Sequence, residues 1–166
     1  MGAGILPVAE YNGKLYFLFG QETYDKKWSD FGGAREKHES NFDNAIREGY
    51  EEIDGFFGTK SELRKLVSEN EIVELEIRNK YSSYLFKIPY DFYLPKYFNN
   101  HHKFIQHNFP TKINKNGFFE KKTLRWFTLD DIIKEHRDFR IFYKEIIELI
   151  INNYKQIKDI TYKIKI

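Results

Sequence analysis

The chain has 166 residues, of which 41% are apolar and 18% aromatic, and its formal net charge is only +2. This composition predicts a single folded domain over residues 1–166, excludes a disordered chain and gives no general attraction to nucleic acid or anionic lipid. The absence of cysteine excludes disulfide and thiolate-metal chemistry, and neither a membrane span nor a signal peptide is visible, so we expect a cytoplasmic protein.

The N-terminal region is predicted to form a β-hairpin followed by a short aromatic segment. Two apolar runs, over residues 4–10 and 14–21, flank Asn12-Gly13, a dipeptide typical of tight hairpin turns. The aromatic segment covers residues 28–31, and a pair of glycines ends it. A polar loop separates it from the hairpin.

A helix is predicted after the glycine pair. Ser40 or Asn41 can cap its N-terminus, because both side chains accept hydrogen bonds from free backbone amides. Apolar residues then recur at helical spacing as far as Ile53. Asp54-Gly55 ends the helix, since both residues tolerate the left-handed conformation of a helix C-terminus.

The rest of the chain alternates helices and strands. Thr59 or Ser61 starts a short helix over residues 62–69, and Asn79-Lys80 joins the two strands of a second hairpin. The later segments are that hairpin over 71–78 and 81–88, an ambiguous stretch over 93–108, a polar loop over 111–117, a strand over 118–127, a helix from Thr128 or Asp130 to Lys134, an amphipathic helix over 139–157 and a tail over 159–166 that forms an extra strand or frays. This order favours an α/β sandwich with a mixed sheet between helices.

Three glutamates of the first predicted helix, Glu48, Glu51 and Glu52, share one face, because residues three and four positions apart are neighbours on a helix. Such like charges repel one another unless a cation neutralises them. The hard metals Mg²⁺ and Mn²⁺ suit carboxylate ligands, and phosphates are common substrates of these metals. The Gly32-Gly33 turn is expected to bring a backbone carbonyl oxygen near the same face.

Arg47 lies beside these glutamates and can reach back to Glu39, which would fix the preceding loop against the helix. Gly49 is in the middle of the helix, where glycine costs roughly 1 kcal/mol relative to alanine. A helix that keeps glycine there needs close approach to the sheet or to the crossing loop. A solvated surface helix is the alternative explanation, but the glycine pair, Glu39 and the spacing together favour a site.

The spacing of these residues resembles the Nudix box, G-x5-E-x7-R-E-U-x-E-E-x-G-U, in which U is a bulky aliphatic residue. The residues that match its first glycine and its charged positions are Gly33, Glu39, Arg47, Glu48, Glu51 and Glu52. Gly49 stands at an aliphatic position, and the closing pair is delayed by one residue, to Gly55-Phe56. Both departures concern the packing and the end of the helix rather than the charged positions.

The resemblance implies a Nudix-like α/β/α sandwich with a mixed central sheet, and a pyrophosphohydrolase that requires Mg²⁺ or Mn²⁺. The metal ligands that it implies are Glu48, Glu51, Glu52 and the carbonyl of Gly32. It also implies that Glu48 orients or deprotonates the attacking water. Arg47 and Glu39 match the structural pair that orients the other residues.

Glu120 is a second candidate for the catalytic base. Many members of the family carry an extra glutamate beyond the box, where it binds another metal or acts as base. Glu120 lies near the start of the strand predicted over residues 118–127, which is a suitable place for that role. An exposed glutamate at the end of a strand is the alternative.

Basic and aromatic residues near the box are candidates for substrate binding. Arg35 and Lys27 can contact phosphate oxygens. Trp28 can stack on a base, although an aromatic residue at this position also suits the core. A basic cluster at residues 101–107 fits a solvated loop or a loop that contacts phosphate.

The expected substrate is a nucleoside diphosphate linked to another group, which leaves nucleotide sugars, ADP-ribose, dinucleoside polyphosphates and nucleoside triphosphates open. The alternatives are decapping of mRNA, with capped RNA as the partner, and hydrolysis of an inositol pyrophosphate. The basic rim that an inositol pyrophosphate needs would come from Lys26, Lys27, Lys121 and Lys122. A non-catalytic nucleotide-binding module is disfavoured, because the box glutamates are present. We expect a monomer or a homodimer.

Overall fold

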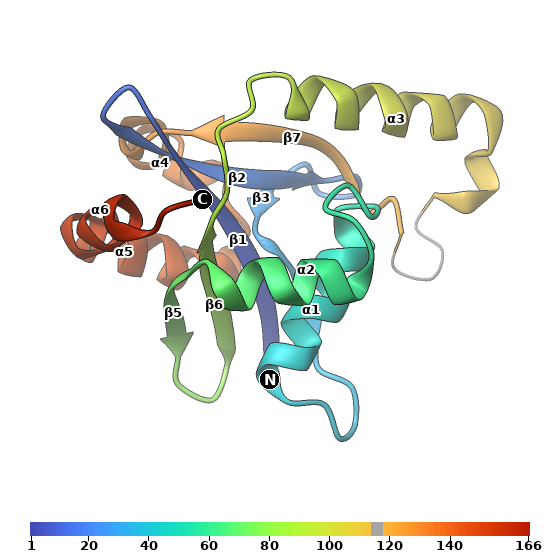
Figure 1. Ribbon diagram of the computed structural model, residues 1–166. Helices are drawn as coiled ribbons and strands as arrows, with labels where there is room; N and C mark the ends of the chain where they lie inside the picture. Colours follow the sequence, from blue (N-terminus) through green and yellow to red (C-terminus); the bar gives the residue numbers. More distant parts are fainter. Residues whose placement is uncertain (114–117) are drawn as a thin grey trace.

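The computed structural model describes residues 1–113 and 118–166, which form a mixed sheet with helices on both faces (Figure 1). The strands are β1 (Gly2–Tyr11), β2 (Lys14–Glu22), β3 (Trp28–Ser29), β4 (Phe31–Ala34), β5 (Glu71–Ile77), β6 (Tyr81–Lys87) and β7 (Lys121–Phe127). The helices are α1 (Asn41–Glu52), α2 (Lys60–Glu69), α3 (Leu94–Asn108), α4 (Leu129–Lys134), α5 (Lys144–Asn152) and α6 (Tyr154–Lys163).

Strand β1 is the centre of the sheet. Its first residues pair antiparallel with β4 and its last residues with β2, whereas its other edge pairs in parallel with β6. Strand β7 pairs antiparallel with β2, and β5 pairs antiparallel with β6. The sheet is therefore mixed, as the sequence predicts.

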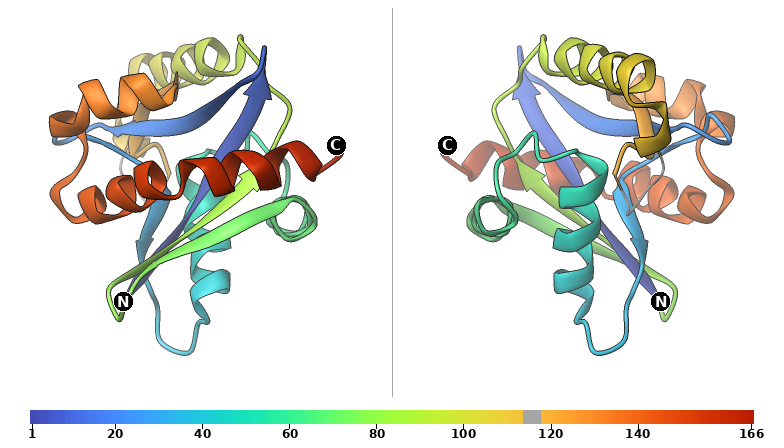
Figure 2. Two further views of the ribbon diagram at one scale, coloured as in Figure 1. Left: turned by 90° about the vertical axis from the view of Figure 1, so that its left-hand side faces the viewer. Right: turned by 90° about the vertical axis from the view of Figure 1, so that its right-hand side faces the viewer.

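The hydrophobic core has two parts, one on each face of the sheet (Figure 2). On one face, α4, α5 and α6 cover the sheet, and the buried residues there include Phe17, Phe19, Ile146, Ile150 and Ile157. On the other face, α1, α2 and α3 contribute to a cluster that includes Ile5, Phe31, Ile46, Leu63 and Phe98. This arrangement confirms the predicted α/β/α sandwich.

Capping residues set the helix boundaries near the predicted positions. The Ser40 side chain accepts a hydrogen bond from the Asp43 amide at the start of α1. Asp54 and Gly55 have positive φ angles of 53° and 71° after α1, as predicted for a helix end. Thr59 starts α2 with a capping box. The ambiguous stretch over 93–108 forms α3.

The C-terminal region differs from its predicted form. The predicted helix over 139–157 is divided at Asn153, whose side-chain amide donates to the Leu149 carbonyl at 2.8 Å. The tail is helical through Lys163 and forms no strand, because Ile157 and Thr161, four residues apart, are both fully buried. Residues 114–117 of the predicted polar loop lie outside the described part of the chain, and β7 starts three residues later than expected, at Lys121.

Within residues 1–113 and 118–166, no helix combines the length and the apolar composition that crossing a bilayer requires.

Candidate active site

The glycine pair Gly32-Gly33 lies in β4, where neighbouring groups leave no room for a side chain. A Cβ atom at Gly32 would lie 2.6 Å from the Ala3 carbonyl oxygen, and one at Gly33 would lie 2.6 Å from the carboxyl carbon of Glu48. The Gly32 amide donates to Glu52 Oε2 at 2.7 Å. The pair thus lets β4 approach α1 and fixes Glu52 through a backbone amide. The role of the Gly32 carbonyl as a metal ligand stays a prediction.

Arg47 on α1 is the centre of an ion-pair network. Its guanidinium contacts Glu39 twice, through Nε to Oε1 at 2.9 Å and through Nη2 to Oε2 at 3.1 Å. It also donates to Glu48 Oε1 at 2.8 Å and to the Ala34 carbonyl at 3.1 Å. The hydrogen bonds from Arg47 lower the pKa of Glu39, which keeps this carboxylate charged. The predicted contact between Arg47 and Glu39 is confirmed, and it holds the loop after β4 against α1.

The three glutamates of α1 share one face but differ in their surroundings. Glu48 and Glu51 contact Arg47 at 2.8 Å and 3.4 Å, and their side chains are 16% and 21% exposed. Glu52 points inward, and its side chain is only 4% exposed. Burial raises the pKa of all three carboxyl groups, most strongly that of Glu52. Such a set favours a cation that can offset the cost of burying carboxylates.

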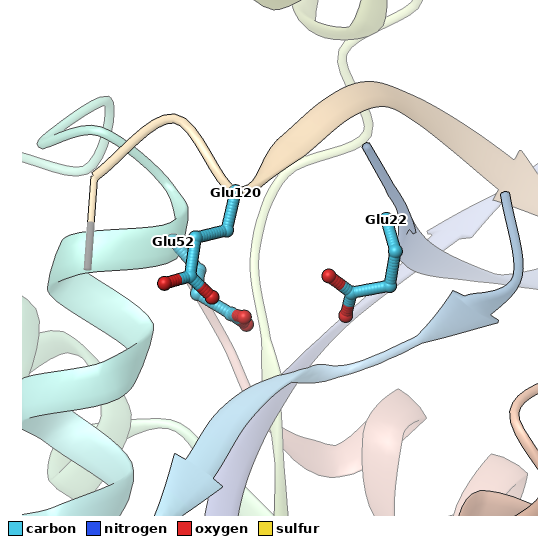
Figure 3. Close-up of side chains that lie close together, drawn as sticks. All are labelled: Glu22, Glu52 and Glu120. Atoms are coloured by element: carbon cyan, nitrogen blue, oxygen red, sulfur yellow. The ribbon is translucent and has the colours of Figure 1, made fainter. Parts of the chain in front are cut away.

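Glu52 is part of a carboxylate cluster with Glu22 and Glu120 (Figure 3). These residues come from the end of α1, the end of β2 and the segment before β7, and one oxygen of each lies within 4.8 Å of the others. Burial raises the pKa of Glu120, and the charges of Glu22 and Glu48 add to the shift. Three elements far apart in the sequence thus provide an oxygen-only set of ligands for a hard divalent cation.

Lys121 is fully buried beside this cluster. Its ammonium group donates to Glu22 and, at 2.8 Å, to Ser29 Oγ, and it lies 3.4 Å from Glu52 Oε2. Burial lowers the pKa of Lys121, but the carboxylates of Glu52 and Glu22 outweigh burial and raise it overall. The lysine is therefore a charged internal partner for two of the three clustered glutamates.

Asp30, between β3 and β4, forms a separate buried network. Its carboxyl oxygens accept hydrogen bonds from Tyr81 Oη at 2.8 Å and from Ser83 Oγ at 2.7 Å. Burial raises the pKa of Asp30 from 3.8 to about 7. These bonds connect β4 to β6 and so help to position the neighbouring glycine pair.

Comparison with known proteins gives structural matches only, since no family model and no curated protein sequence matches the chain. An Ap4A hydrolase of C. elegans in a binary complex has a TM-score of 0.56, with 18% identity, over 93% of this chain and 96% of that chain. RenU, a Nudix hydrolase from M. smegmatis, has a TM-score of 0.52, with 14% identity, over 95% of this chain and 87% of that chain.

The chain has the fold of the Nudix hydrolases. A further match is the bifunctional NMN adenylyltransferase/ADP-ribose pyrophosphatase from Francisella tularensis complexed with AMP and a manganese ion. It has a TM-score of 0.54, with 15% identity, over 91% of this chain and 41% of that chain. In this Nudix fold, the box-like segment is the β4 strand, the following loop and α1.

The candidate substrate residues near the box lie in different places. Trp28 is only 8% exposed and packs edge-on against Phe127, with ring centroids 5.0 Å apart. Its proposed stacking on a base is therefore wrong, because the ring belongs to the core. Arg35 is exposed and donates to Asn41 Oδ1 at 3.3 Å. The side chain of Lys27 is 41% exposed and lines a cavity.

Two expectations about basic groups change with the structure. Lys121 cannot belong to a basic rim, because its ammonium group is buried among carboxylates. The basic cluster at residues 101–107 forms part of α3 instead of a loop, and His102 is buried within it.

Sequence reasoning missed Glu22, Lys121 and Arg140 as members of the site. Arg140 Nη1 lies 3.1 Å from Glu22 Oε1, although the two residues are 118 positions apart. The available signals were weak: Glu22 directly follows a predicted strand, and Lys121 follows the candidate base Glu120. Neither signal shows which strand ends meet in space.

Proposed function

We propose that the protein is a hydrolase that requires Mg²⁺ or Mn²⁺ and cleaves a diphosphate linkage in a nucleoside diphosphate-linked substrate. The observation that carries the proposal is the cluster of Glu22, Glu52 and Glu120 beside α1 on a Nudix fold. Carboxylate oxygens without sulfur or nitrogen ligands fit Mg²⁺ or Mn²⁺ better than softer metals.

Glu22 and Glu52 would hold the metal ion with Glu120 beside it, and Glu48, Glu51 and the Gly32 carbonyl are further candidate ligands. When bound, the ion would neutralise phosphate charge and make water a better nucleophile. Lys121 would hold the carboxylates of Glu22 and Glu52 in place. Arg47 would orient Glu48 and Glu51 and keep the Glu39 loop against α1.

We assign the role of general base to Glu120, with Glu48 as the alternative. In the described part of the chain, no hydrogen bond or ion pair involves the Glu120 carboxylate, whereas Arg47 holds Glu48. Burial raises the pKa of Glu120, which moves it toward the range where a carboxylate accepts a proton effectively at neutral pH. Both features support Glu120 as the group that takes a proton from water.

The named neighbours support a nucleotide substrate. One is an Ap4A hydrolase, and another is part of an ADP-ribose pyrophosphatase with AMP and manganese. At 18% and 15% identity, these names indicate the class of substrate rather than one compound.

The test is a substrate panel with Mg²⁺ or Mn²⁺ and identification of the products by mass. The panel contains ADP-ribose, a nucleotide sugar, Ap4A, a nucleoside triphosphate and capped RNA. Glu52→Gln and Glu120→Gln should each reduce kcat by about 100-fold or more, in the range of general acid–base contributions. Glu148→Gln, on the exposed surface of α5, is the matched control and should retain activity.

Direct metal binding gives a second measurement. Isothermal titration with Mn²⁺ should show weaker binding to Glu52→Gln than to Glu148→Gln. The proposal fails if the wild-type protein hydrolyses no member of the panel and binds Mn²⁺ no better than Glu52→Gln. Release of m7GDP from capped RNA, with free nucleotides left intact, would make decapping the function.

A further inference from the structure

A basic cavity adjoins the carboxylate cluster, and its lining has no part in the chemistry proposed above. The cavity has a volume of about 720 Å³, which is in the range of small-molecule sites. Four cationic side chains line it, Lys27, Arg137, Arg140 and Lys144, against one carboxylate, Asp25. The excess of positive charge suits a ligand with several negative charges.

Arg140 connects this cavity to the carboxylate cluster. Its Nη1 atom lies 3.1 Å from Glu22 Oε1, and its Nε atom lies 3.5 Å from Asp25 Oδ2. Arg140 and Phe142 also line a second cavity of about 390 Å³, whose wall includes Gly32. A ligand placed along Gly32 can therefore extend past Arg140 into the basic cavity.

The backbone around the basic cavity is fixed to the core. The Arg140 amide donates to the Trp28 carbonyl at 3.0 Å, and the neighbouring Phe139 is fully buried. Lys27 Nζ donates to the Arg137 carbonyl at 3.0 Å. The guanidinium of Arg140 lies over the Phe142 ring, 5.0 Å from its centroid. The side chains of Arg140 and Lys27 are thus held in place before a ligand binds, which lowers the entropic cost of binding.

Existing ion pairs leave most of this charge available. Within residues 1–113 and 118–166, neither Arg137 nor Lys144 forms an ion pair, and Lys27 has only an exposed pair with Asp138 at 3.7 Å. Exposed pairs of this kind contribute little and exchange easily with other anions. Two or three cations can therefore serve a ligand.

We propose that this cavity binds phosphate groups that the substrate carries in addition to the cleaved diphosphate. The proposal rests on the proposed function and narrows its substrate class to polyphosphorylated molecules. One end of the substrate would lie at the glutamates, and its further phosphates would contact Arg137, Arg140, Lys144 and Lys27. The extra phosphates belong either to a linear chain or to a ring that carries several phosphates.

Binding to the metal-free protein tests this assignment without catalysis. The probes are pyrophosphate, linear tripolyphosphate and inositol hexakisphosphate, titrated by calorimetry at low ionic strength. The double variant Arg137→Gln/Lys144→Gln removes two cations from the surface of the cavity. The control Lys65→Gln/Lys155→Gln removes two exposed lysines from α2 and α6, and the melting temperatures of both variants verify folding.

The Kd of tripolyphosphate, of inositol hexakisphosphate or of both should rise about tenfold in the cavity variant, as expected for the loss of two solvent-accessible ion pairs. The Kd of pyrophosphate should rise less, and the control should leave all three values within about twofold of wild type. A larger effect on tripolyphosphate indicates a linear chain, and a larger effect on inositol hexakisphosphate indicates a ring. Equal effects of both variants, or equal effects on all three probes, would overturn the proposal.

Hydrolysis separates this proposal from the proposed function. The ratio of kcat/KM for Ap4A to kcat/KM for ADP-ribose should be lower in the cavity variant than in the wild-type protein. If both compounds are hydrolysed but the ratio stays constant, the cavity assignment fails and the proposed function stands. If the wild-type protein hydrolyses no member of the substrate panel and binds Mn²⁺ no better than Glu52→Gln, while the cavity variant loses binding of tripolyphosphate or inositol hexakisphosphate, the proposed function fails and an anion site remains.

Discussion

Arg47 and Lys121 both contact glutamates of the candidate active site, but they do so in different surroundings. The side chain of Arg47 on α1 is 15% exposed, and its partner Glu39 is eight positions away in sequence. Lys121 is fully buried at the start of β7, and its partner Glu22 is 99 positions away. One network therefore forms within a single segment, whereas the other requires the complete sheet.

The difference in burial gives the two networks different energetic roles. Water and the loop can compensate partly for a missing Arg47, because the surrounding carboxylates are near solvent. No water replaces Lys121 in a fully buried position, so its partners would keep their charge without compensation or take up protons. The buried network around Lys121 should control stability, and the network around Arg47 should control the position of the loop between β4 and α1.

Replacing Lys121 should have the largest effect on stability. We expect Lys121→Met to lower the free energy of unfolding by about 3–5 kcal/mol, because it leaves Glu52 buried without its cation and Glu22 with Arg140 alone. Urea denaturation measures the loss, with Lys122→Met as the adjacent control. Mn²⁺ should raise the melting temperature of Lys121→Met more than that of wild type, since the ion replaces part of the missing charge. A loss equal to that of Lys122→Met would show that the buried network adds no stability.

The same contrast explains what could be predicted from the sequence. Helix periodicity and capping residues indicate α1 and the Arg47–Glu39 contact, because these features depend on residues close together in the chain. The expected turn at Gly32-Gly33 is wrong, because both glycines pair with β1 within strand β4. The alternation of strands and helices also indicates the sandwich. The meeting of Glu22 with Glu120 depends on the pairing of β2 with β7, which no local pattern specifies.

Errors at single residues have the same cause. Trp28 and Lys121 have side chains that suit either a surface or a core, and only tertiary packing decides between the two. The alternating Ile and Lys residues of the tail suggest a strand, but burial of Ile157 and Thr161 makes the segment helical. In each case, long-range contacts outweigh the local pattern.

The two networks should also differ in their response to pH. Asp30 lies near the buried network, and its pKa is raised from 3.8 to about 7. Because the folded state keeps this proton longer, Asp30 stabilises the fold fully below pH 3.8, and this contribution is lost as the pH rises to about 7. Glu39 has a lowered pKa, so its contribution is present above the unfolded value and is lost on acidification.

Urea midpoints of wild type and Asp30→Asn between pH 4 and pH 8 measure this difference. The stability of wild type relative to the variant should fall by up to about 4 kcal/mol across the window, at about 1.4 kcal/mol per pH unit. Asp54, whose pKa is also about 7, is present in both proteins and cancels in the difference. A constant difference would contradict the assignment of a raised pKa to Asp30.

Replacing Arg47 should have a smaller effect on stability than replacing Lys121. We expect Arg47→Gln to lower the free energy of unfolding by about 1–3 kcal/mol, because charged hydrogen bonds to Glu39 and Glu48 are lost near the surface. Limited proteolysis should cut the loop between β4 and α1 faster in the variant. Arg64→Gln, which removes a more exposed pair with Asp43, is the matched control. Cleavage at the same rate in both variants would show that Arg47 does not hold the loop.

The smallest effect concerns Gly49, on the α1 surface that packs against β1. A Cβ atom at Gly49 would lie 2.6 Å from Ile5 Cγ1, so the helix needs glycine for close contact with the sheet. Alanine gains roughly 1 kcal/mol in helix propensity, whereas overpacking costs about 1–3 kcal/mol. We therefore expect Gly49→Ala to lower the free energy of unfolding by at most about 2 kcal/mol.

A double-mutant cycle with Ile5→Val separates the two contributions. In wild type, Ile5→Val should cost about 0.5–1.5 kcal/mol through a lost methyl group. In the Gly49→Ala background it should cost less, because the smaller side chain relieves the contact. Additive effects would show that the cost of Gly49→Ala does not come from its contact with Ile5. Coupling would show that the departure from the box pattern at Gly49 is a packing requirement, which leaves Arg47 and Glu52 in place on either side of it.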